Sequence, residues 1–131
     1  MLCANYVDGN DVTLGAFPTD KPWKYGMMAV DSQGNVSGLI DKPPHTELKY
    51  MWGIACWSYR FAALMHEYLL ERQNPNKETV LSDIFEAALR KKLQMRAVTF
   101  SEGSYLDIGT PDDLLLALRR FNLIRPREEA D

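Results

Sequence analysis

The chain has 131 residues, of which 46% are hydrophobic, and its 15 basic and 18 acidic side chains give a formal net charge of −3. This composition predicts one compact domain with its own core and excludes a disordered or disulfide-stapled chain. The acidic balance provides no broad cationic face, so we expect no nucleic-acid partner. Cys3 and Cys56 are far apart, which is typical of reduced thiols in the cytoplasm, and we expect neither a leader peptide nor a membrane-spanning segment.

The first part of the chain is predicted to consist of strands. Residues 11–17 alternate β-branched and small apolar side chains and stop at Pro18, which indicates a strand. Two apolar runs within residues 25–42 flank the sequence DSQGN, in which Gly34 supplies the positive φ of a bulged hairpin turn. Residues 51–59 are apolar nearly throughout, as expected of a strand that is covered on both faces.

Two helices and two short strands are predicted to follow. Apolar side chains recur at helical spacing over residues 60–72 and again over residues 79–93, where basic side chains fill the last turn. Residues 95–100 and 104–108 are each predicted to form a short strand, and a tight turn connects them.

The clearest helix start lies at Thr110. This residue supplies an N-cap, Pro111 occupies the first helical position, and two acidic residues follow at the positive end of the helix dipole. We expect the polar residues 125–131 to form a fraying tail behind a domain of residues 1–124. The order of strands and helices predicts an α/β fold with a mixed sheet and flanking helices.

Asp41 and Lys42 stand together at the end of the predicted hairpin. Because Lys42 precedes Pro43, we expect its backbone to be extended and its side chain to project from a fixed strand end. A lysine held in this way suits a phosphate, and Asp41 suits sugar hydroxyls. Neighbouring strand residues point to opposite faces, so a shared ligand requires the strand to twist or bend there. From these residues alone, a solvated charge pair at a sheet edge is the simpler interpretation.

Asp107 ends a predicted strand, at the position beyond which open α/β sheets usually bind ligands. A carboxylate there suits a hard cation such as Mg²⁺, which takes one or two carboxylates and fills its shell with water and substrate phosphates. The alternative role for Asp107 is a second cap for the helix at Thr110. Gly26 and Gly53 either let the backbone approach a ligand closely or mark bulges in their strands.

Six short motifs occur in an order and spacing that resemble one enzyme family. They are YG at 25–26, the hairpin VDSQGNV, DKP at 41–43, WGIACW at 52–57, ETVLSD at 78–83 and YLDIGTPDDLLLA at 105–117. Together they resemble the sugar-phosphate nucleotidyltransferases, the pyrophosphorylases that make nucleotide sugars, such as glucose-1-phosphate thymidylyltransferase. The resemblance covers almost the whole chain but only the latter half of such an enzyme. It implies a partial Rossmann-like nucleotidyltransferase fold from which the N-terminal nucleotide-binding half is missing.

The resemblance also implies roles for five residues. The backbones of Gly26 and Gly53 would face the sugar, and Asp41 would bind sugar hydroxyls. Lys42 would bind the sugar phosphate, and Asp107 would be a ligand of Mg²⁺, so these two residues would be the catalytic ones. The implied substrates are a sugar 1-phosphate and a nucleoside triphosphate.

The implied reaction is attack of a sugar-1-phosphate oxygen on the α-phosphorus of the nucleotide, with pyrophosphate as the leaving group. Such a reaction is catalysed by positioning and by neutralisation of charge. The sequence contains no G-x-G-x-x-G phosphate loop. We therefore expect the chain to be the sugar-phosphate-binding portion and to be inactive alone, which leaves open whether it is itself an enzyme. Asp41 is shorter than the family's usual glutamate, and Tyr105 stands in place of a tryptophan.

Two other functions remain open. In the first, the chain is a non-catalytic sugar-nucleotide-binding or regulatory module. In the second, it is a self-associating structural protein. Missing neighbours would leave unpaired strand edges and apolar surface, so we expect a homo-oligomer.

Overall fold

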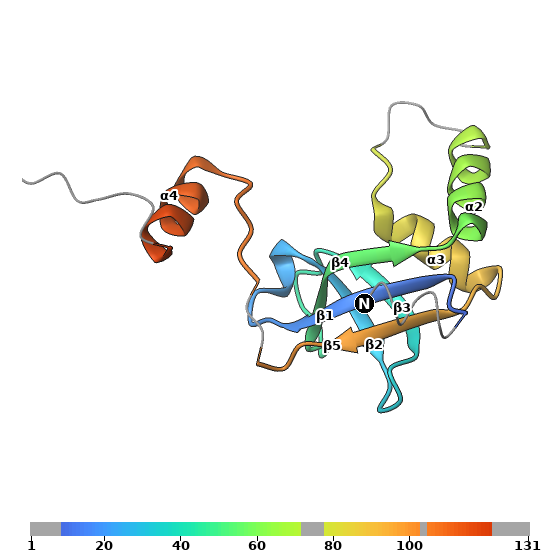
Figure 1. Ribbon diagram of the computed structural model, residues 1–131, viewed down its shortest axis with the longest axis horizontal. Coiled ribbons are helices and arrows are strands. Elements are labelled where there is room, and N and C mark those ends of the chain that lie inside the picture. Colours follow the sequence, from blue (N-terminus) through green and yellow to red (C-terminus); the bar gives the residue numbers. More distant parts are fainter. Residues whose placement is uncertain (1–8, 72–77, 103–104, 122–131) are drawn as a thin grey trace, which may run out of the picture.

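The computed structural model describes residues 9–71, 78–102 and 105–121, which form a five-stranded sheet with flanking helices (Figure 1). The strands are β1 (Val12–Pro18), β2 (Gly26–Val30), β3 (Val36–Asp41), β4 (Tyr50–Trp57) and β5 (Met95–Thr99). The helices are the 3-10 helix η1 (Pro22–Lys24) and the α-helices α2 (Tyr59–Leu70), α3 (Leu81–Arg90) and α4 (Pro111–Arg120). In the described ranges, none of these helices combines the length and apolar character needed to cross a membrane.

The sheet is mixed and has the strand order β3-β2-β4-β1-β5. β1 and β5 run parallel, whereas β4 is antiparallel to both β1 and β2, and β2 is antiparallel to β3. β1 lies between β4 and β5, and its residues 12–17 are all buried. The strands predicted at 11–17, 51–59 and 95–100, the hairpin at 25–42 and the α/β class are therefore confirmed.

Helices α2 and α3 cover one face of the sheet and bury the main core. Phe61 of α2 and Phe85 of α3 are fully buried and stack with their ring centroids 5.3 Å apart. Trp52 of β4 packs edge-on against Phe85, also with centroids 5.3 Å apart. The sheet contributes buried side chains to this core, among them Val12, Leu14, Ala16, Met28 and Leu39. The helical spacing of apolar residues in the sequence thus forms the inner surface of both helices.

A second, smaller cluster lies where β1 and β5 end. Phe17, Met27 and Met51 are buried there, and Phe17 stacks on Phe100 with ring centroids 5.0 Å apart. The carboxyl ends of the two parallel strands meet at this place. In open α/β sheets, that end of the sheet is where ligands usually bind.

The tip of the β2–β3 hairpin folds back onto β5. Asn35 forms an antiparallel bridge with Arg96, and the Arg96 guanidinium donates a hydrogen bond to the Gln33 carbonyl. The Ala97 N–H donates to the Gly34 carbonyl at 2.7 Å. Gly34 has a φ of +83°, and a Cβ at this position would lie 2.9 Å from the Ala97 carbonyl oxygen. The turn therefore requires glycine, as the sequence predicted, and it covers part of the outer edge of β5.

The strand predicted at 104–108 is wrong. Residues 105–109 have no regular secondary structure, and residue 104 lies outside the described residues. A strand needs a neighbour that supplies hydrogen bonds, and the hairpin tip already occupies part of the outer edge of β5. The chain instead runs irregularly into α4, whose start behind Thr110 agrees with the prediction.

Two helix boundaries also differ from the prediction. Helix α3 ends before residue 93 because Lys92 takes a φ of +61°, which does not continue a right-handed helix. Helix α2 ends at Leu70, whereas its predicted range was 60–72. The predicted tail at 125–131 lies outside the described residues.

Candidate functional site

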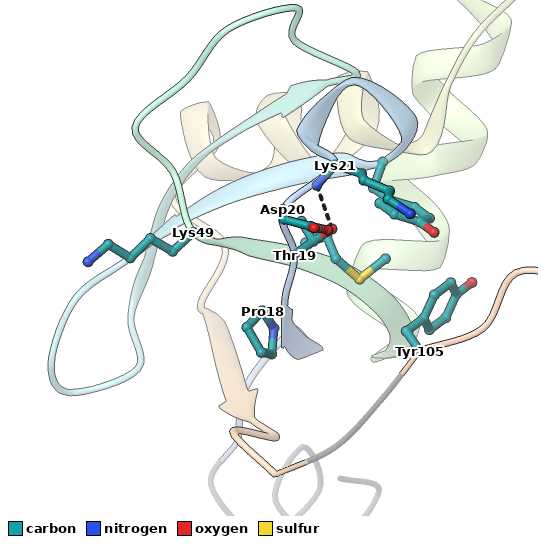
Figure 2. A pocket seen from close by; sticks show the side chains of 8 residues that line it. Pro18, Thr19, Asp20, Lys21, Lys49 and Tyr105 are labelled. Carbon is teal, nitrogen blue, oxygen red and sulfur yellow. Dashed lines mark hydrogen bonds between the residues drawn. The ribbon is translucent and has the colours of Figure 1, made fainter.

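A hollow of about 630 Å³ opens at the carboxyl end of β1 (Figure 2). Two strands, the loop behind β1 and the segment before α4 contribute to its wall. The lining residues are Pro18, Thr19, Asp20, Lys21, Tyr25, Lys49, Met51 and Tyr105. The hollow therefore combines aromatic rings with hydroxyl, carboxylate and ammonium groups, which together suit a polar ligand with an apolar face.

The loop behind β1 is held by its own backbone and by β4. The Thr19 N–H donates to the Lys49 carbonyl at 3.2 Å, and the Lys21 N–H donates to the Thr19 hydroxyl at 3.1 Å. Pro22 then starts η1. Figure 2 shows that the side chain of Lys49 extends away from the other labelled residues, whereas Asp20 and Lys21 lie close to Thr19.

Two tyrosines meet at the hollow. The rings of Tyr25 and Tyr105 are edge-on with centroids 5.8 Å apart, and the Tyr105 ring lies 5.7 Å from the ring of Phe17. Partial burial raises the pKa of both tyrosines above the ordinary value of 10.0, and the nearby carboxylate of Asp107 raises both further. Both phenols are thus held protonated and can donate hydrogen bonds at neutral pH.

Acidic groups from three separate segments act on Tyr25. After burial, the causes of its raised pKa are Asp107 in the segment before α4, Asp113 in the first turn of α4 and Asp20 in the loop behind β1. No group of three or more side chains suited to a metal ion occurs in residues 9–71, 78–102 and 105–121.

The structure places Gly26, Asp41 and Lys42 side by side. Gly26 pairs with Asp41 across the β2–β3 ladder, and the Lys42 N–H donates to the Tyr25 carbonyl at 3.1 Å. Both Asp41 and Lys42 are exposed. The charged pair predicted from the sequence is thus fixed beside Tyr25, which lines the hollow.

The extended backbone predicted for Lys42 is wrong. Lys42 has a φ of +44°, in the left-handed region, although it precedes Pro43. The hydrogen bond to Tyr25 continues the β2–β3 ladder to this residue, and the chain then turns towards the buried Pro43. Such a backbone costs about 1–3 kcal/mol in a residue other than glycine, and residues of this kind cluster at functional sites.

Aromatic rings occupy the space beside both predicted sugar-facing glycines. A Cβ on Gly26 would collide with the indole nitrogen of Trp52, and a Cβ on Gly53 would lie 2.5 Å from the ring of Tyr105. The indole N–H of Trp52 in turn donates to the Ser82 hydroxyl at 3.4 Å. Both glycines therefore admit a ring of this chain in the observed conformation.

Asp107 is exposed in the irregular segment before α4. The cap of that helix is made by other residues: the Asp113 N–H donates to the Thr110 hydroxyl at 3.2 Å, and the Thr110 hydroxyl donates to the Asp113 carboxylate at 2.7 Å. Asp113 thus fills the second capping role that was the alternative for Asp107.

Gly26, Asp41 and Lys42 adjoin Tyr25 through the backbone, and Gly53 lies beside the ring of Tyr105. The residues that line the hollow include others. Neither Lys42 nor Asp107 belongs to its wall, whereas Asp20 and Lys21 do. The sequence analysis missed these two. A signal was present, because they lie between Pro18 and Pro22 directly behind a strand, where backbone rigidity favours a fixed ligand contact.

Comparison with known proteins gives a consistent result. The family model described as "Nucleotidyl transferase" matches residues 3–122. The bifunctional protein GlmU of Campylobacter hominis is 24% identical over 103 residues, which cover 76% of this chain and 24% of that protein.

Two solved structures share the fold. One is a Bacillus anthracis protein described as a glucose-1-phosphate thymidylyltransferase, in complex with sucrose, with a TM-score of 0.69 at 19% identity, covering 95% of this chain and 50% of that one. The other is the nucleoside-diphosphate-sugar pyrophosphorylase of Vibrio cholerae, with a TM-score of 0.66 at 13% identity, covering 88% of this chain and 49% of that one. The chain thus spans about half the length of these structures and about a quarter of the curated relative.

Proposed function

This chain belongs to the nucleotidyl transferase family, and we propose that it forms the sugar-phosphate-binding part of a sugar-1-phosphate nucleotidyltransferase. The proposed reaction joins a nucleoside triphosphate and a sugar 1-phosphate into a nucleotide sugar and releases pyrophosphate. The observation that carries the proposal is the position of Asp41 and Lys42, whose backbones the β2–β3 ladder sets beside Gly26 and Tyr25 at the hollow, near the carboxyl ends of two parallel strands.

The bend at Lys42 supports a joint contact of the charged pair with one ligand. Neighbouring residues of a regular strand point to opposite faces, so Asp41 and Lys42 can share a ligand only where the chain bends. The positive φ of Lys42 supplies that bend. In the proposed complex, the Lys42 ammonium binds the sugar phosphate, and the Asp41 carboxylate accepts hydrogen bonds from sugar hydroxyls.

The sugar ring is proposed to lie in the hollow beside Gly26 and Gly53. Because the Tyr105 ring stands over Gly53, a sugar that faces this backbone has to displace the ring. The protonated hydroxyls of Tyr25 and Tyr105 then donate hydrogen bonds to the ligand.

Asp107 is proposed to hold Mg²⁺. A single exposed carboxylate fits this ion, which completes its shell with water and substrate phosphates. When bound, the ion would neutralise phosphate charge and so favour the reaction. The residues of this chain bind and orient the sugar phosphate, and we propose little or no turnover by the chain alone, since its sequence has no G-x-G-x-x-G loop for the nucleotide.

An amide NMR titration of the chain with glucose 1-phosphate and Mg²⁺ tests the proposal. We expect shifts at Gly26, Lys42, Gly53 and Asp107, and we expect Lys42→Gln to weaken binding about 10- to 100-fold, because a charge-assisted hydrogen bond is lost. Lys24→Gln is the matched control, since Lys24 is exposed and lies outside the hollow. Unchanged spectra at millimolar ligand would contradict the proposal.

A non-catalytic sugar-nucleotide-binding module is the second candidate. Both candidates predict binding and little or no turnover by this chain alone. A pyrophosphate-release assay with a nucleoside triphosphate and a sugar 1-phosphate therefore separates them only when the chain is joined to the nucleotide-binding half of a relative, since only the transferase part would then release pyrophosphate. For either function we propose a cytoplasmic location, where the free thiol of Cys56 stays reduced.

A further inference from the structure

A separate hollow of about 430 Å³ opens beside the loop that follows β1. Its wall consists of that loop, η1 and residues 44–48, which connect β3 to β4. Thr19 and Asp20 line both this hollow and the one at the end of β1, so the two adjoin. The volume lies within the range of about 300–1,000 Å³ that is usual for small-molecule sites. We call it the Trp23 hollow, after the indole in its wall.

The Trp23 indole has neither a ring partner nor a hydrogen bond within the described part of the chain. Trp23 is 53% exposed, whereas Trp52 packs against Phe85 and Trp57 packs against Phe61. An indole is a large apolar surface with one polar N–H, and burial of such a surface is favourable. The ring of Trp23 is therefore available to a ligand that has an apolar face.

The backbone of η1 fixes the position of Trp23. The Lys24 N–H donates to the Lys21 carbonyl at 3.0 Å, and the Tyr25 N–H donates to the Pro22 carbonyl at 3.3 Å. The ring of Pro22 also restricts the backbone directly before Trp23. A ligand that stacks on the indole consequently has little backbone to order, which lowers the entropic cost of binding.

Two hydroxyl groups in the wall of the Trp23 hollow have protons to donate. The Thr19 hydroxyl accepts a hydrogen bond from the Lys21 N–H, and the Thr46 hydroxyl accepts one from the Leu48 N–H, both at 3.1 Å. Neither hydroxyl donates to another group of residues 9–71, 78–102 and 105–121. Because a hydroxyl both donates and accepts, each can donate to a ligand while it holds its own loop.

The charged groups in the wall decide which ligand suits the Trp23 hollow. Asp20 and Glu47 contribute carboxylates and His45 contributes an imidazole, and among the described residues neither lysine nor arginine lines it. The hollow at the end of β1, by contrast, has Lys21 and Lys49 in its wall. The two carboxylates repel a phosphate but accept hydrogen bonds from hydroxyl groups.

We propose that the Trp23 hollow is a separate carbohydrate subsite that takes a neutral pyranose. The apolar C–H face of the sugar ring stacks on the indole of Trp23, and the carboxylates of Asp20 and Glu47 accept hydrogen bonds from sugar hydroxyls. The proposal goes beyond the proposed function, because a sugar without a phosphate group requires neither Lys42 nor Asp107.

Titration of the full chain with methyl α-D-glucopyranoside tests the proposal, with NMR detection of the indole and backbone N–H signals. We expect the Trp23 indole and the Glu47 amide to shift with a dissociation constant of about 1–10 mM. Trp57, which is 43% exposed and outside the hollow, is the matched control and should not shift. An unchanged Trp23 signal, an equal shift at Trp57, or shifts confined to Gly26 and Gly53 would overturn the proposal.

Substitution of the aromatic residue tests the stacking contact. Trp23→Ala should weaken binding of the glucoside about 10-fold, and Trp23→Phe, which keeps a ring, should restore most of it. Trp57→Ala should leave the dissociation constant unchanged. Binding by Trp23→Ala that is as tight as in the wild type would overturn the proposal.

Two further variants test the carboxylate and separate this subsite from the proposed sugar-phosphate site. Glu47→Gln should weaken glucoside binding about 5-fold, and Glu71→Gln, which changes an exposed residue outside both hollows, should not. Lys42→Gln should weaken binding of glucose 1-phosphate while the glucoside still shifts the Trp23 indole. Equal effects of the two glutamine variants, or loss of the Trp23 shift in Lys42→Gln, would overturn the proposal.

Discussion

Helices α3 and α4 have the same length of ten residues and a similar amphipathic pattern, but their surroundings differ. α3 buries five residues, among them Phe85 at the centre of the core, whereas α4 buries none. Figure 1 shows α4 standing apart from the sheet, while α3 lies against it. An apolar stripe therefore does not by itself determine that a helix packs.

Signals in the local sequence account for the formation of α4, whereas tertiary packing accounts for the formation of α3. α4 begins with the Thr110 cap and Pro111, has acidic residues in its first turn and basic ones in its last, and so is stabilised by its own sequence. α3 begins at Leu81, its N-cap residue Val80 provides no side-chain hydrogen bond, and the helix depends on burial. The apolar side of α4 instead lines a hollow of about 440 Å³ together with Leu106 and Ile108.

The largest effect is expected from truncating Phe85 of α3, compared with truncating Phe121, which directly follows α4. Phe85→Ala should lower the free energy of unfolding by about 3–5 kcal/mol, because it leaves a cavity in the main core. Phe121→Ala, behind α4 at 64% exposure, should change it by less than about 0.5 kcal/mol. Urea denaturation of both variants measures the difference. A large loss in Phe121→Ala would mean that α4 packs in solution.

A smaller effect is expected from removing helix caps. Ser58 accepts a hydrogen bond from the Phe61 N–H at the start of α2, which is packed, as Thr110 does for Asp113 in α4. Ser58→Ala should cost about 1 kcal/mol of global stability. Thr110→Ala should instead increase amide exchange in the first turn of α4 and leave global unfolding unchanged. Equal global losses in the two variants would contradict the contrast between a packed and an unpacked helix.

The smallest effect concerns the first turn of α4, which lies close enough to Tyr25 to affect its pKa. Asp113→Asn should lower the pKa of Tyr25, and Asp107→Asn should lower the pKa values of both Tyr25 and Tyr105. Ultraviolet titration of the phenolates measures these shifts. An unchanged pKa of Tyr25 in Asp113→Asn would place α4 elsewhere.

The same shifts set how stability depends on alkaline pH. Both tyrosines have a raised pKa in the folded chain, so their contribution to stability is complete below pH 10.0, the ordinary tyrosine value, and is lost as the pH rises through the folded pKa. The Asp107→Asn variant should narrow the pH range over which this loss occurs.

Patterns that depend on nearby residues were predictable from the sequence, and patterns that depend on distant partners were not. The hairpin at 25–42 and the cap at Thr110 involve residues close in the chain, and both were predicted. The strand at 104–108 was not formed, because alternation of apolar residues does not reveal whether a partner strand is available. Lys42 is not extended although Pro43 follows it: its φ is +44° where the chain turns towards the buried Pro43.

The candidate site was also predictable only in part, because some of its residues are recognisable locally and others only from their distant neighbours. Asp41, Lys42 and Asp107 have side chains whose chemistry suggests a ligand. The β2–β3 ladder sets the backbones of Asp41 and Lys42 beside Gly26 and Tyr25, and the Asp107 carboxylate raises the pKa of Tyr25. Asp20 and Lys21 can be recognised as candidate site residues only because they line the hollow. That hollow is formed by β1, β4 and the segment at Tyr105 together. No local pattern contains that arrangement.

The hydrogen bond between Arg96 and Gln33 joins residues that are 63 positions apart in the chain. Closing so long a loop costs conformational entropy, and this cost arises before the contact can stabilise the chain. The hydrogen bond between Arg96 and Gln33 is therefore expected to form late in folding. During synthesis, the hairpin emerges from the ribosome well before β5 does. Until β5 arrives, β1 lacks its parallel neighbour, and a nascent chain halted before residue 95 would be prone to aggregation.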